Sequence, residues 1–158
     1  IRDSNMAIEI SICQPFFKTS NTLGSNGHIF ALDLLEMELI KNVDFLKGDF
    51  REQEILDILV KKLGKTSLDL VISDMAPNIT GVDSIDQPSS MYLVELALQF
   101  ALENLSKEGV FLVKVFQGEG FDTYLKAMRD GFQKVITRKP DASRARSREV
   151  YLLGRILK

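Results

Sequence analysis

The fold is decided by residues 68–78, which read LDLVISDMAPN. Four of the first five residues are apolar, as in a central parallel strand that is covered on both faces. Pro77 then prevents the strand from continuing. The stretch therefore predicts a buried strand that ends by placing Asp74 in a polar turn. In open α/β sheets ligands bind at this end of the strands, although a lone aspartate after a strand more often caps a turn.

The composition bounds the class of protein. With 158 residues, of which 45% are hydrophobic, the chain can bury one sizeable core, so we expect a single domain over residues 1–158. A single cysteine, Cys13, excludes an internal disulfide. Together with a single histidine it indicates metal-free chemistry in a reducing, cytoplasmic compartment. The apolar segments fall short of the ~20 residues that a membrane span requires, so no membrane anchor is expected.

Strands and helices are expected to alternate along the chain. Apolar patterns predict strands near residues 8–12, 28–32, 43–46, 68–72, 109–116, 134–137 and 149–156. Helical periodicity predicts helices at residues 51–63, 91–105 and 121–132, the second capped by Ser89 or Ser90 after a loop through Gly81 and Pro88. This order is typical of a doubly wound, mostly parallel α/β sheet. The last two strands, joined without a helix, are expected to form an antiparallel pair at its edge.

A lysine inside a strand suggests a charged cluster. Lys114 lies between Val113 and Val115, and burying its ammonium is costly unless it meets a carboxylate or faces a ligand. Asp74 and Glu149 are the obvious partners if their strands lie close by. A structural ion pair and a catalytic group are about equally compatible with this spacing.

Two further aspartates follow strands. Asp33 and Asp49 are suited to hydrogen bonds with a ribose and with the amino group of a base, although each alone could simply cap a turn. Residues 118–120, GEG, lack the G-x-G-x-x-G spacing and are assigned to a tight turn before a helix that Asp122 caps.

The region around residues 134–148 is strongly basic. It carries six cations against the single acid Asp141, which favours a phosphate-binding patch over a solvated loop. The cations are Lys134, Arg138, Lys139, Arg144, Arg146 and Arg148.

Four strings carry a family resemblance: SDMAPN (73–78), MYLVELAL (91–98), VKVFQGEGFD (113–122) and SRARSREVY (143–151). From Gly24 to its end, the chain resembles the FtsJ family of RNA 2′-O-methyltransferases. The resemblance implies a Rossmann-like methyltransferase fold that uses S-adenosylmethionine. The implied substrate is a uridine ribose in large-subunit ribosomal RNA, free or within the assembled subunit.

The same resemblance implies roles for individual residues. The last three members of the family's Lys-Asp-Lys-Glu tetrad fall on Asp74, Lys114 and Glu149, with Lys114 as the candidate base. Cofactor contacts fall on Asp33, Asp49 and Asp74. Contacts to RNA phosphates are expected from Lys139, Arg144, Arg146 and Arg148.

The start of the chain departs from the family pattern. The family's first strand runs into a glycine-rich turn, whereas here residues 7–17 occupy that place, with Cys13 and Pro15 instead of a glycine and a tryptophan. The first lysine of the tetrad would lie upstream of Ile1. We therefore expect residues 1–22 to be atypical, as from a frame-shifted or misassembled start. A second function is kept open, namely a catalytically impaired RNA-binding or ribosome-associated relic of the family.

Overall fold

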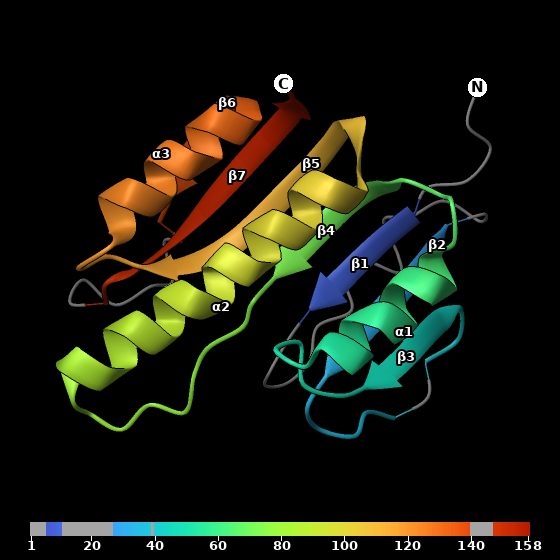
Figure 1. Cartoon of the computed structure of the whole chain (residues 1–158), viewed down its shortest axis with the longest axis horizontal. Helices are drawn as coiled ribbons and strands as arrows, with labels where there is room; N and C mark the ends of the chain where they lie inside the picture. Colours follow the sequence, from blue (N-terminus) through green and yellow to red (C-terminus); the bar gives the residue numbers. More distant parts are fainter. Residues whose placement is uncertain (1–5, 11–26, 39, 140–146) are drawn as a thin grey trace.

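The computed structural model describes residues 6–10, 27–38, 40–139 and 147–158. These residues form a seven-stranded sheet with the strand order β3-β2-β1-β4-β5-β7-β6 (Figure 1). The strands are β1 (Met6–Ile10), β2 (His28–Asp33), β3 (Val43–Lys47), β4 (Leu68–Ser73), β5 (Leu105–Phe116), β6 (Phe132–Arg138) and β7 (Glu149–Leu157). The helices of this part of the chain are α1 (Gln53–Leu63), α2 (Asp83–Asn104) and α3 (Phe121–Gly131).

Strand pairing confirms the predicted α/β sheet. β1 is parallel to β2 and to β4, β2 is parallel to β3, and β4 is parallel to β5. β7 is antiparallel to both β5 and β6. Because β6 is the last strand in the order, the antiparallel pair β6 and β7 lies at one edge of the sheet, as predicted.

The main core lies between the sheet and the helices, which share one face of the sheet in Figure 1. Phe111, Val113 and Val115 of β5 are buried in this core together with Ala97 of α2 and Met128 of α3. Successive side chains of a strand point to opposite faces. Lys114, which lies between the two valines, therefore points away from the core.

The second helix begins earlier than predicted. The sequence indicated a loop through Pro88 and a helix that Ser89 or Ser90 caps, but α2 already begins at Asp83. Pro88 lies inside the helix, in its second turn, where its missing N–H leaves α2 without one helical hydrogen bond. The Ser89 hydroxyl caps nothing, since it donates to the carbonyl oxygen of Ile85 at 2.8 Å.

The third helix also differs at its start. Gly120 takes the N-cap position with φ +86, the left-handed region that favours glycine, and no side chain caps the helix. Asp122 was expected to be the cap but lies within the first turn. The assignment of residues 118–120 to a tight turn is correct, because the Phe121 N–H donates to the Gly118 carbonyl oxygen at 3.2 Å.

The N-terminal predictions are only partly open to comparison. The weak strand is confirmed over Met6–Ile10, where Ile8 is fully buried, and it lies near the middle of the sheet. Residues 1–5 and 11–26, which hold most of the segment expected to be atypical, lie outside the described residues. In the part of the chain that the structure describes, no helix is long and apolar enough to cross a membrane.

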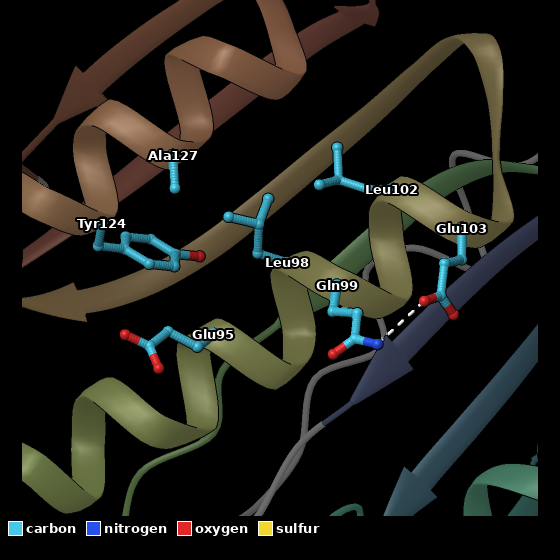
Figure 2. A pocket seen from close by; sticks show the side chains of 7 residues that line it. All are labelled: Glu95, Leu98, Gln99, Leu102, Glu103, Tyr124 and Ala127. Atoms are coloured by element: carbon cyan, nitrogen blue, oxygen red, sulfur yellow. Dashed lines mark hydrogen bonds between the residues drawn. The ribbon is translucent and has the colours of Figure 1, made fainter.

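A groove of about 300 Å³ separates α2 from α3 (Figure 2). Glu95 and Leu98 line it from α2, and Tyr124 lines it from α3. The Tyr124 side chain is almost completely buried, and its hydroxyl has no hydrogen-bond partner among the described residues. Burial, assisted by the negative charge of Glu95, raises the pKa of Tyr124 well above its ordinary value. The hydroxyl is therefore protonated and unsatisfied.

This geometry predicts an unusual response to substitution of Tyr124. An unpaired buried polar group costs ~1–3 kcal/mol, so Tyr124→Phe should leave the free energy of unfolding unchanged or raise it by up to ~1 kcal/mol. Tyr124→Ala should lower it by ~3–5 kcal/mol, because the ring fills the core. Urea titration measures both values. A clear loss of stability in the Phe variant would mean that the hydroxyl is hydrogen-bonded.

Candidate active site at the carboxyl edge of the sheet

The order of the strands creates a switch point beside β1. From β1 the chain proceeds to β2 and β3 on one side, whereas β4 and β5 extend the sheet on the other side. In such sheets the crevice outside the carboxyl ends at the switch point is the usual ligand site. Ile10, the last residue of β1, pairs with Leu32 on one side and Ser73 on the other. Asp33 and Asp74 each lie one residue further, so they flank the end of β1.

Lys114 and Asp74 meet at this edge. The Lys114 Nζ lies 2.7 Å from Asp74 Oδ1 as an ion pair, and it donates a hydrogen bond to the Asp74 backbone carbonyl oxygen at 3.1 Å. The Lys114 side chain is only 13% exposed, whereas that of Asp74 is 38% exposed. The predicted contact between these two residues is confirmed. The lysine is held from two directions, and the aspartate remains open to solvent on one side.

Glu149 joins the cluster through Tyr151. Tyr151 lies directly opposite Lys114 in the pairing of β5 with β7, and Glu149 lies opposite Phe116. Burial raises the pKa of Tyr151 to about 12, and the charges of Asp74 and Glu149 and a hydrogen bond to Glu149 act in the same direction. The phenol is therefore protonated at neutral pH and donates to Glu149. The sequence analysis missed Tyr151, although the period of two along a strand would have put it on the same face as Glu149.

Asp33 and Asp49 end neighbouring strands on the other side of β1. Asp33 Oδ1 accepts a hydrogen bond from the Leu35 backbone N–H at 2.8 Å, and the Asp33 carbonyl accepts one from Gly48. Asp49 accepts hydrogen bonds from the backbone and the guanidinium of Arg51. The bonds from the Arg51 side chain hold the pKa of Asp49 below its ordinary value. Both aspartates therefore do cap turns, and both lie at the carboxyl edge of the sheet.

The basic segment is described only at its two ends. The Lys139 Nζ donates to the Ser147 carbonyl oxygen at 3.0 Å, which joins the two ends of the connection between β6 and β7. The Arg148 guanidinium pairs with Asp83 Oδ1 at 2.7 Å. Arg144 and Arg146 lie outside the described residues. Of the four residues predicted to contact phosphates, the structure therefore describes two. Lys139 follows β6, and Arg148 pairs with the first turn of α2.

A buried glutamine fixes α2 against the site. The Gln87 side-chain amide donates to the carbonyl oxygens of Glu119, at 2.9 Å, and of Phe116, at 3.3 Å. A Cβ added at Gly118 would lie 2.8 Å from the Gln87 side chain, so a larger residue there would displace the Gln87 amide. Nothing in the sequence pattern marked Gln87, because its partners are backbone atoms of a distant turn.

Comparison with known proteins identifies the family. The family model of FtsJ-like methyltransferases matches residues 14–157. The chain belongs to this family. It is 57% identical over 135 residues to a protein of Chromohalobacter salexigens named ribosomal RNA large subunit methyltransferase E. That match covers 85% of this chain and 64% of the relative, so the chain spans less than two thirds of the relative's length.

Solved structures agree on the fold of this FtsJ-like chain. A crystal structure described as a ribosomal RNA methyltransferase from Plasmodium falciparum has a TM-score of 0.80 at 22% identity, covering 97% of this chain and 86% of that one. Human methyltransferase-like protein 13 in complex with SAH has a TM-score of 0.60 at 14% identity, covering 96% of this chain and 72% of that one. At these identities the likeness establishes the methyltransferase fold. The predicted Rossmann-like architecture is thereby confirmed.

The environment of Tyr151 predicts how its phenol titrates. Its pKa is raised from 10.0 to about 12, so its contribution to stability is fully present below about pH 10 and is lost as the pH rises through about 12. Phenolate absorbance, taken as the difference between the parent protein and Tyr151→Phe, should show a midpoint near 12. Glu149→Gln should lower that midpoint, because it removes a negative charge. A midpoint near 10 in the parent would place Tyr151 outside the cluster.

Proposed function

We propose that this protein transfers a methyl group from S-adenosylmethionine to a ribose 2′-hydroxyl of large-subunit ribosomal RNA. The observation that carries the proposal is the Lys114–Asp74 pair at the switch point of an FtsJ-like sheet, with Glu149 and Tyr151 beside it. The name of the Chromohalobacter relative supports the same substrate class. A ribosomal RNA substrate implies that the protein acts in the cytoplasm.

The described residues fit the cofactor on its nucleoside side. Adenine and ribose present an amino group and hydroxyl groups, which carboxylates accept well. Asp33 and Asp49 end the neighbouring strands β2 and β3 at the same edge as Asp74, and all three are only partly exposed. Asp33 uses one oxygen for its turn, and Asp49 shares both oxygens with Arg51. We assign the ribose to Asp33, the adenine side to Asp49 and the reacting end to Asp74.

Lys114 is positioned to handle the proton of the target hydroxyl. The bound cofactor supplies a methyl group on a sulfonium sulfur, and that sulfur keeps the electron pair of the breaking bond. Lys114 takes the hydroxyl proton at Nζ while the oxygen attacks, which requires that its own proton has left first. Asp74 Oδ1 then stabilises the ammonium from 2.7 Å, and the Asp74 carbonyl keeps Nζ in place.

Glu149 and Tyr151 act as positioning residues in this scheme. The protonated phenol of Tyr151 donates to Glu149 and lies across from Lys114. This hydrogen bond fixes the orientation of the Glu149 carboxylate beside Tyr151. Lys139 and Arg148, together with Arg144 and Arg146, are assigned to RNA phosphates, which fix the strand without reading its bases.

A second function rests on the start of the chain. Residues 7–17 lack the glycine-rich turn of the family, which is where backbone and cofactor meet closely. A protein that keeps the RNA surface but has lost cofactor binding would be an RNA-binding or ribosome-associated relic. Cofactor affinity separates the two functions, because the relic binds RNA without S-adenosylmethionine.

Cofactor binding can be measured by calorimetry with S-adenosylmethionine. Asp33→Ala should weaken binding by about tenfold to a hundredfold, as expected for loss of a hydrogen bond to a charged group. Asp33→Asn keeps an acceptor for the Leu35 N–H but loses the charge, so it should also bind more weakly than the parent. Asp57→Ala on the exposed face of α1 is the matched control. Parent-like affinity in Asp33→Asn would mean that Asp33 only caps its turn.

Methyl transfer tests the role of Lys114. Lys114→Ala should abolish transfer to ribosomal RNA while leaving the affinity for S-adenosylmethionine within about twofold, because its amine touches the hydroxyl rather than the nucleoside. Lys107→Ala removes an exposed lysine of the same strand and should keep full activity. Radioactive methyl incorporation into large-subunit RNA measures both variants. Full activity in Lys114→Ala would refute the assignment.

A further inference from the structure

A cluster of exposed aliphatic side chains lies between β4 and the first turn of α2. Ile79 is 70% exposed, Val82 48% and Ile85 53%. Single apolar residues on a surface need no explanation, whereas grouped ones often mark a binding site. Ile79 is the most exposed large apolar residue of the described chain, and the three lie within seven positions. We call these three residues the apolar loop patch.

The patch is held rigidly. The Asp86 carboxylate accepts hydrogen bonds from the Thr80 backbone N–H and hydroxyl, both at 2.8 Å, and from the Gly81 N–H at 3.0 Å. The bond from the Thr80 backbone is the main reason that the pKa of Asp86 lies below its ordinary value. The N–H groups of Ile85 and Asp86 both donate to the Val82 carbonyl oxygen. The loop therefore presents its aliphatic side chains from a defined backbone.

The patch is also continuous with the proposed RNA surface. Figure 1 shows the first turns of α2 and the loop before them extending past the carboxyl end of β4, where Asp74 follows. Gln87 ties this end of α2 to the turn after β5, and Asp83 pairs with Arg148. The patch thus belongs to the segment that connects Asp74 to the first turn of α2, where Asp83 pairs with the arginine that we assign to phosphate.

The charges around the patch are compatible with nucleic acid as its occupant. Its two nearest acids are both engaged, Asp83 with Arg148 and Asp86 with the loop backbone. The aliphatic side chains themselves offer no partner to a phosphate. They suit the flat, apolar faces of unpaired bases, which become available where single-stranded RNA is splayed out.

We propose that the apolar loop patch contacts the bases that adjoin the methylated ribose. This inference rests on the proposed function and adds a base-contacting surface to it. The patch would hold the flanking nucleotides while the phosphates bind the basic segment, so it would contribute affinity for single-stranded over duplex RNA.

The experiment compares RNA affinity across salt concentrations. The double variant Ile79→Ser/Ile85→Ser is measured with RNA extracted from large ribosomal subunits, and the control is Ile58→Ser, an exposed aliphatic residue of α1. The double variant should bind roughly tenfold more weakly at every salt concentration, with an unchanged slope of log affinity against log salt, because base contacts release no counterions. Arg148→Ala should instead reduce the slope by ~0.7 to 0.9.

Three other outcomes would overturn the inference. If the double variant had the RNA affinity of the parent and the same KM for RNA, the patch would not contact RNA. A reduced slope of log affinity against log salt in the double variant would mean that the patch supports contacts to phosphates rather than to bases. Unchanged binding to extracted RNA with slower methylation of intact subunits would assign it to a ribosomal protein. If the parent binds RNA but neither binds S-adenosylmethionine nor methylates RNA, the proposed function fails while the affinity comparison still decides the patch.

Discussion

A parallel sheet brings the carboxyl ends of its strands to one edge, and the chemistry of this protein depends on that constraint. β1, β2, β3, β4 and β5 all run in the same direction. Asp33, Asp49 and Asp74 are distant in sequence, yet each follows a strand and so reaches the same edge. β7 runs the other way and contributes residues from its start, which is why Glu149 and Tyr151 meet the end of β5.

Alternate side chains of β5 serve two purposes, because Val113 and Val115 pack in the core whereas Lys114 belongs to the candidate site. Val113 and Val115 are almost completely buried among the helices, and the residue between them must point to the opposite face. The lysine there is only 13% exposed and needs an acid within reach. Asp74 supplies that acid from the adjacent strand at 2.7 Å. The same core that fixes the valines therefore fixes the position of the Lys114 amine.

The start of α2 adds a second layer of organisation. An early helix start turns a segment expected to be a loop into a rigid projection beside the site. Gln87, Asp83 and Asp86 connect this projection to the turn after β5, to Arg148 and to its own preceding loop. The exposed aliphatic residues of this region are thus presented on a framework rather than on a free loop.

The amino-acid sequence by itself determined the alternation of strands and helices, the antiparallel pair at the edge, and the meeting of Asp74 with Lys114. Those features follow from local apolar periods and from the cost of an unpaired buried lysine. Only the tertiary structure decided that α2 begins before Pro88, that Gln87 bonds to a distant turn, and that the phenol of Tyr151 donates to Glu149 across from Lys114. The contacts of Gln87 and Tyr151 depend on backbone atoms and charges brought together from separate elements, and no local pattern of residues encodes such distances.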